Sequence, residues 1–150
     1  MPKAASEVLA AGWSRPGATL RFARMLLNGG TLDGVQILSP KTIQLMATNH
    51  LPDGKDLPAL SRSLFSEAMF DGSGFGPGFA VVIDPPKTLI PGSQGDFSWG
   101  GAASTYFWID PREELTTIFM TQLMPSTTYT IRRELRTLVY SAFTESRCSS

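Results

Sequence analysis

The chain is poor in the residue types that build metal cages, disulfide scaffolds and nucleic-acid surfaces. Its 150 residues include one histidine and one cysteine, and thirteen basic side chains balance thirteen acidic ones to a net charge of zero. A lone cysteine, Cys148, cannot form a disulfide within the chain. A neutral balance provides no basic face for a phosphate backbone. We therefore expect no internal disulfide and no nucleic-acid partner.

Long apolar runs are also missing. No run approaches the roughly 18 apolar residues of a membrane span, so we expect no membrane partner. Near the N-terminus, a short apolar stretch has Lys3 before it and the acidic Glu7 within it, and an acidic residue there is unlike a secretory signal. The 42% hydrophobic and 17% charged composition is typical of a globular protein. We expect a single domain over residues 1–150, located in the cytoplasm.

Capping signals predict a pair of helices in the first third. Residues 14–16, Ser-Arg-Pro, start one helix, and residues 28–30, Asn-Gly-Gly, end it. Ser39 followed by Pro40 starts a second helix, which should cover about residues 40–48. The segment 51–78 is rich in proline and glycine, and we expect it to run over the surface with a short helix near residues 61–70.

β-branched and aromatic residues predict four strands in an antiparallel meander. They cover residues 79–84, 96–101, 105–110 and 115–122. A C-terminal helix follows, with apolar residues at helical spacing from Ile131 to Ala142. This stripe should lie on the sheet, with Arg132, Arg133 and Arg136 on the solvated side. The predicted fold class is α+β.

The stretch from Asp96 to Asp110 contains the most specific pattern, a strand that enters Trp99-Gly100-Gly101 and a second strand that leaves it. It resembles the third active-site motif of the serine β-lactamase and penicillin-binding superfamily. The Trp-Gly-Gly form is that of the esterase branch, which comprises family VIII carboxylesterases and class C β-lactamase relatives. The helical order in residues 21–52 also resembles this branch. The resemblance covers about residues 12–143.

The other two motifs of that superfamily are absent. Its nucleophile motif is Ser-x-x-Lys, and none of the lysines at positions 3, 41, 55 and 87 has a serine three places earlier. Its second motif is Tyr-x-Asn, and the tyrosines at 106, 129 and 140 have no asparagine two places on. The resemblance thus implies a truncated β-lactamase-like domain, and we expect an open reading frame that begins inside the family's sequence.

The resemblance also implies site residues. Trp99, Gly100 and Gly101 would form a substrate-binding wall, and the Ala102 N–H would be one of two donors to an oxyanion. The hydroxyls of Ser98 and Ser104 are candidate replacement nucleophiles, although neither has a visible base nearby in the sequence.

The single histidine, His50, has two interpretations. The plainer one is a group that caps a helix end. In the other, three copies around a three-fold axis bring three His50 side chains to zinc or another divalent metal, which acidifies a water. Asp53 and Asp56 would then hydrogen-bond to the ligands.

Two functions therefore remain open. One is a small hydrolase of esters or phosphoesters that does not use the Ser-x-x-Lys mechanism. The other is a non-catalytic remnant, an assembly module or half of a split esterase. If truncation exposes ~1,000 Å² of apolar sheet, its burial is worth roughly 25 kcal/mol gross against an association cost of about 4–15 kcal/mol. We therefore expect a homo-oligomer or strand addition at an open edge.

Overall fold

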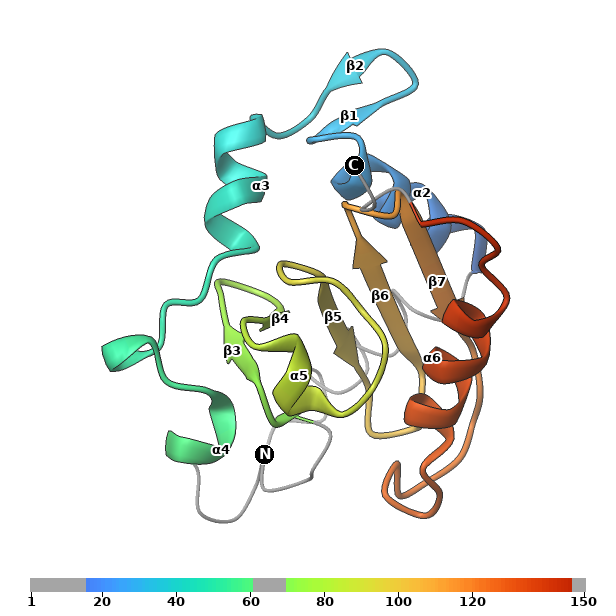
Figure 1. Ribbon diagram of the computed structural model, residues 1–150. Coiled ribbons are helices and arrows are strands. Elements are labelled where there is room, and N and C mark those ends of the chain that lie inside the picture. Colours follow the sequence, from blue (N-terminus) through green and yellow to red (C-terminus); the bar gives the residue numbers. More distant parts are fainter. Residues whose placement is uncertain (1–15, 61–69, 147–150) are drawn as a thin grey trace, which may run out of the picture.

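A computed structural model describes residues 16–60 and 70–146 of the chain. Its centre is an antiparallel sheet in the order β3-β4-β5-β6-β7, with helices on both faces (Figure 1). The strands are β3 (Ser73–Phe75), β4 (Ala80–Val82), β5 (Phe97–Gly100), β6 (Tyr106–Asp110) and β7 (Leu115–Phe119). The α+β class is thus as predicted.

The sheet has five strands, and the prediction of four was wrong. The additional strand is β3, which lies in a segment that we expected to run over the surface. Its three residues, Ser-Gly-Phe, are too few to show alternation, and glycine has a low strand propensity. Tertiary contacts select it instead: the side chain of Asn49 accepts a hydrogen bond from the Phe75 N–H at 3.0 Å, and β3 pairs with β4 along its whole length.

The N-terminal helical pair is confirmed. The helices and the short hairpin are α2 (Pro16–Leu27), β1 (Thr31–Leu32), β2 (Val35–Gln36), α3 (Pro40–Met46), η1 (Pro52–Gly54), α4 (Leu57–Leu60), α5 (Pro85–Thr88) and α6 (Ile131–Ser141). Ser39 caps α3, since its Oγ accepts the Thr42 N–H at 3.1 Å. The Ser14 cap and most of the helix predicted near residues 61–70 lie outside the described residues. No described helix has both the length and the apolar composition needed to cross a bilayer.

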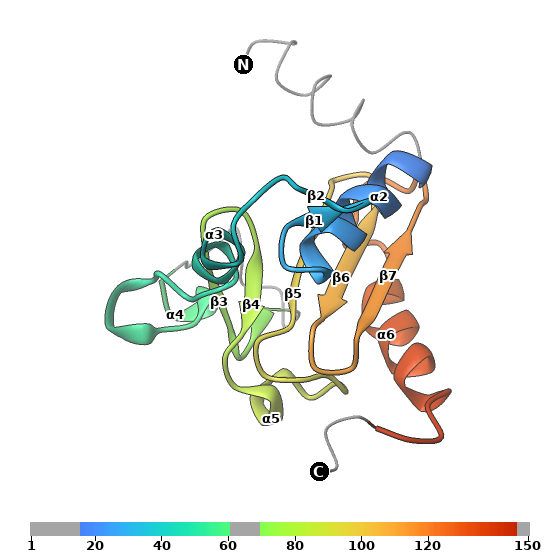
Figure 2. The same cartoon turned by 90° about the horizontal axis from the view of Figure 1, so that it is seen from above.

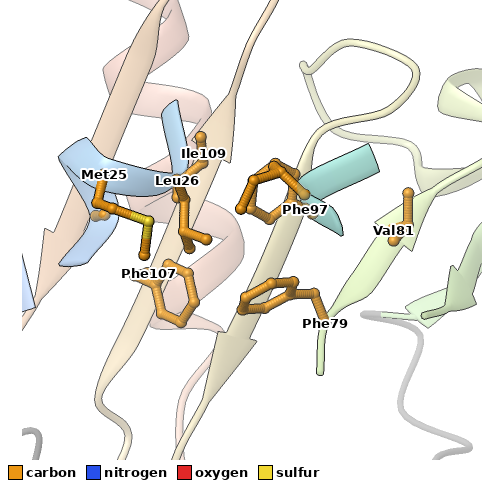
Figure 3. Packing of buried hydrophobic residues seen from close by; sticks show 9 residues of the cluster. Met25, Leu26, Phe79, Val81, Phe97, Phe107 and Ile109 are labelled. Atoms are coloured by element: carbon orange, nitrogen blue, oxygen red, sulfur yellow. The ribbon is translucent and has the colours of Figure 1, made fainter. Parts of the chain in front are cut away.

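The hydrophobic core lies between α2 and one face of the sheet (Figure 3). Met25 and Leu26 of α2 are buried over Phe107 and Ile109 of β6, and Phe97 of β5 continues this layer. The ring of Phe79 packs against Phe97 and Phe107 at centroid distances of 5.1 and 5.9 Å. Alternation along β5 and β6 places these residues on one face, so their neighbours must face the other.

That opposite face carries buried polar groups among its aromatic residues, and it is covered by α6 (Figure 2). Arg136 is buried, forms an ion pair with Asp96 and lies over the Trp108 ring at 5.8 Å. Tyr140 donates a hydrogen bond to Asp110 Oδ2 at 2.7 Å. Leu138, by contrast, is 69% exposed.

The predicted orientation of α6 was therefore wrong. The arginines Arg132 and Arg136 point inward, and the centre of the apolar stripe points outward. The physical reason lies in the sheet, whose α6-facing side carries buried Asp96 and Asp110. Buried carboxylates need charged or hydrogen-bonding partners, and this requirement outweighs the burial of one leucine.

Candidate acyl-ester site

The Trp99-Gly100-Gly101 segment ends β5 and enters the tight turn that leads to β6. The Gly101 N–H donates to the carbonyl oxygen of Thr105 at 2.9 Å, and the Ser104 N–H donates to the carbonyl oxygen of Gly101 at 3.1 Å. A Cβ at Gly100 would lie 2.9 Å from the Thr105 carbonyl oxygen and from Arg132 Cζ, which is closer than real Cβ contacts. The glycine is thus required by close approach of the backbone.

Arg132 of α6 holds this turn from one side. Its Nη2 donates to the carbonyl oxygens of Gly101 at 2.7 Å and Thr105 at 3.2 Å, and its guanidinium lies 5.3 Å from the Tyr106 ring centroid. Charge-assisted bonds of this kind are among the stronger ones in proteins. Sequence reasoning missed this residue because the helical pattern placed it in solvent.

The segment after β7 holds the turn from another side. The Leu123 N–H donates to the carbonyl oxygen of Ala103 at 3.1 Å, and Ser104 Oγ donates to the carbonyl oxygen of Leu123 at 2.6 Å. Ser104 is fully buried and has a φ of 67°. The Ser104 hydroxyl, proposed as a nucleophile, is therefore occupied in a structural hydrogen bond.

The backbone after Ser98 pairs with no described strand on its outer side. β4 pairs with β5 only through Ala80 to Ser98 and Val81 to Phe97, so β4 does not reach Trp99 and Gly100. Ala102 is exposed, and its N–H forms no hydrogen bond to another described residue. A carbonyl group placed along this strand end could accept a hydrogen bond from that N–H.

Trp99 lies on the α2 side of the sheet. Its half-buried ring meets Phe75 edge-on, with centroids 5.1 Å apart, and lies 6.4 Å from Phe70. It also packs against the hydrophobic core. The ring is thus fixed by its neighbours, as a rigid wall for a ligand requires.

Ser98 faces the opposite side and is buried. It lines a cavity of about 20 Å³ between the sheet and α6, together with Tyr106, Arg132 and Arg136. A cavity of this size has room for about one water molecule. Among the described residues, the space that Ser98 lines is therefore too small to hold an ester.

His50 lies at the end of α3, away from the turn. Its Nε2 is 3.0 Å from the carbonyl oxygen of Leu45, as the helix-end interpretation predicted, and its backbone N–H donates to the carbonyl oxygen of Phe75 at 2.9 Å. Among the described residues of one chain, no group of three or more histidine, cysteine or acidic side chains could hold a metal ion. The three-fold metal site stays a hypothesis.

The two aspartates near His50 have other partners. Asp53 forms an exposed ion pair with Lys55 at 3.0 Å. Asp56 is buried, forms an ion pair with Lys87 and accepts the Ala59 and Gly72 N–H groups at 3.3 Å each. The hydrogen bond from Lys87 lowers the pKa of Asp56, against the opposing effect of burial.

Known proteins share this architecture. The described chain aligns with the simvastatin synthase LovD from Aspergillus terreus at a TM-score of 0.66 and 20% identity, over 87% of this chain and 34% of LovD. It aligns with EstCE1, a hydrolase with promiscuous acyltransferase activity, at 0.63 and 24% identity, over 83% of this chain and 29% of EstCE1. A penicillin-binding protein homologue from Caulobacter crescentus aligns at 0.60 and 19% identity, over 84% of this chain and 31% of the homologue.

The chain has part of the serine β-lactamase fold. At these identities the likeness establishes the fold alone.

In sequence, the chain is 40% identical over 116 residues to an uncharacterized protein of Mycobacterium tuberculosis, which is called Protein Rv1367c in strain H37Rv. The match covers 75% of this chain and 28% of that protein. No protein-family model matches the chain. The chain thus spans about a third or less of the length of the proteins that it matches.

Proposed function

We propose that the chain forms the strand wall and one oxyanion donor of an ester-hydrolysing site, and that the attacking group comes from another polypeptide segment. In this role Trp99 bounds the acyl group, and the Ala102 N–H donates to its carbonyl oxygen. The observation that supports the proposal is the clamped turn, which holds an unused N–H at an open strand end.

The positions of the two serines favour an external nucleophile. Ser104 Oγ is committed to the carbonyl oxygen of Leu123, and Ser98 faces a water-sized cavity on the other side of the sheet. Activation of a serine needs a base within hydrogen-bond reach. Lys87, the one described lysine with a buried partner, forms its ion pair with Asp56. A site that has one of the two oxyanion donors and no nucleophile can bind an acyl group but does not turn it over.

The test is complementation. The purified chain is assayed with 4-nitrophenyl esters, 4-nitrophenyl phosphate and a chromogenic cephalosporin, alone and mixed with the residues of the Mycobacterium tuberculosis relative that lie outside the match. We expect ester turnover in the mixture only. Ala102→Pro removes the N–H and should lower kcat by about 10²–10³-fold, whereas the matched control Ala102→Gly keeps the N–H and most of the activity.

Three results would contradict this assignment: a mixed complex that forms but hydrolyses no ester, turnover in the mixture that Ala102→Pro leaves unchanged, or efficient turnover by the chain alone. If that last activity disappeared both in chelator and in His50→Ala, it would support the alternative of a hydrolase with metal-bound water.

A further inference from the structure

No described strand pairs with the outer edge of β7. β7 ends the sheet and pairs with β6 over all five of its residues without a bulge. Its sequence, Leu-Thr-Thr-Ile-Phe, contains no charge and no proline. Edge strands in soluble proteins are usually protected from pairing by charges, prolines, bulges or a covering element. Within the described residues β7 has none of these on its outer side.

The row of β7 side chains that faces α6 is apolar at both ends. Tyr106, Trp108 and Asp110 of β6 contact α6, and they pair with Phe119, Thr117 and Leu115 of β7. Paired residues in an antiparallel sheet share a face. Leu115 and Phe119 therefore lie on the α6 side, where both are only partly buried.

The flank of α6 nearer to β7 is apolar as well. Arg132 and Arg136 mark the inward direction, and Arg133, on one flank, donates to the carbonyl oxygen of Thr88 in α5 at 3.4 Å. At 100° per residue Leu135 and Val139 lie on the other flank, away from α5 and toward β7. Leu138 points outward between the flanks. Figure 1 shows α6 beside β7 at this side of the sheet.

Together these residues form the β7–α6 surface, which we define as the outer edge of β7 with Leu115 and Phe119, and Leu135, Leu138 and Val139 of α6. We propose that this surface binds a second copy of the chain, with the two β7 strands antiparallel about a two-fold axis at Thr117. The proposal is independent of the ester site.

The pattern of β7 is self-complementary in that register. Leu115 of each copy pairs with Phe119 of the other, and Thr117 pairs with its own mate, so that apolar residues meet apolar residues. Glu113 and Glu114 precede β7, and the residues that follow Phe119, Met-Thr-Gln, are uncharged. Two copies therefore bring no like charges opposite each other, and the net charge of zero adds no long-range repulsion.

The same two-fold axis orients the helices favourably. An axis perpendicular to the sheet keeps both α6 helices on one face, with their Leu135 and Val139 flanks turned toward each other. A five-residue strand and one helix flank form a contact at the low end of the size range, below about 1,200 Å² in total. We therefore expect a reversible dimer with a micromolar Kd.

Sedimentation velocity over a range of protein concentrations tests the proposal. The wild-type chain should shift from monomer to dimer as the concentration rises. Thr117→Lys brings two charges together at the axis, and Leu138→Glu charges the helix flank; each should raise the Kd at least about tenfold. The controls Val35→Lys and Leu45→Glu alter a strand and a helix residue that are 64% and 54% exposed elsewhere, and they should leave the Kd unchanged.

A cross-link gives a second measurement that does not depend on weakened binding. In a Cys148→Ser background, Thr117→Cys should form an intermolecular disulfide under mild oxidation, whereas Val35→Cys should not. A chain that stays monomeric at every concentration would refute the proposal. So would a dimer that Thr117→Lys does not weaken, or Thr117→Cys and Val35→Cys cross-linking to the same extent. Circular dichroism establishes that each variant is folded.

Discussion

The buried Asp96 carboxylate should make the protein less stable as the pH rises from 4 to 6. Asp96 is fully buried, one of its oxygens accepts from Arg136, and the other, Oδ1, has no partner among the described residues. Burial raises the pKa of Asp96 to about 6, against the attraction of Arg136, and the nearby charge of Asp110 adds to the increase.

The direction and size of this pH dependence follow from the linkage between proton binding and folding. In the unfolded chain the pKa of Asp96 is near its usual 3.8, so between pH 4 and 6 the folded state binds more protons than the unfolded state. Stability therefore falls with rising pH in this window. The difference between about 6 and 3.8 corresponds to about 3 kcal/mol in the free energy of unfolding, present below pH 4 and lost above pH 6.

The perturbation is Asp96→Asn, which has the same shape and does not titrate. Urea unfolding is followed by fluorescence at several values from pH 4 to pH 7, and the free energy of unfolding of the variant is subtracted from that of the wild type. Contributions of other carboxylates, such as Asp56, largely cancel in this difference. We expect the difference to decrease by about 3 kcal/mol toward pH 7. An increase toward pH 7 would show that Arg136 outweighs burial and would refute the reasoning.

Two further predictions concern the turn and the histidine. Arg132→Ala removes two charge-assisted hydrogen bonds and should lower the free energy of unfolding by about 2 kcal/mol. It should also speed amide exchange, measured by NMR, at Gly101 and Ser104, whose N–H groups are hydrogen-bonded within the turn, while the exposed control Arg112→Ala changes neither quantity. Unchanged exchange would mean that Arg132 does not hold the turn. His50→Ala should lower the free energy of unfolding by about 1 kcal/mol through loss of the contact with Leu45. Elemental analysis should find no stoichiometric zinc in the wild type. Stoichiometric zinc that His50→Ala abolishes would instead favour the three-fold metal site.

Local chemistry predicted the helical pair and most of the meander. Ser39 followed by Pro40 specifies a helix start by itself, since the hydroxyl caps the Thr42 N–H and proline needs no donor at the first helical position. The aromatic and β-branched run of β6 likewise needs no distant partner to be recognised as a strand. β3 escaped prediction because its pairing depends on Asn49 and β4, which lie elsewhere in the sequence.

The candidate site, too, was predictable only where its residues are adjacent in sequence. The resemblance pointed to Trp99-Gly100-Gly101 from residues that are adjacent in sequence, and the role of this segment as a substrate-binding wall stays a prediction. It did not reveal that Ser104 is bonded to Leu123 or that Ser98 faces a water-sized cavity, because both facts depend on which face each strand residue takes in the folded sheet.

The orientation of α6 shows the limit most clearly. Helical periodicity identifies which residues share a face, but it does not determine which face turns inward. That choice is made by Asp96 and Asp110, which lie on a sheet face formed before α6 in the sequence and which no apolar stripe could satisfy. One inverted helix therefore has two consequences: it supplies Arg132 to the turn that carries the Ala102 N–H, and it leaves Leu138 exposed among the described residues, on the surface that we propose binds a second copy of the chain.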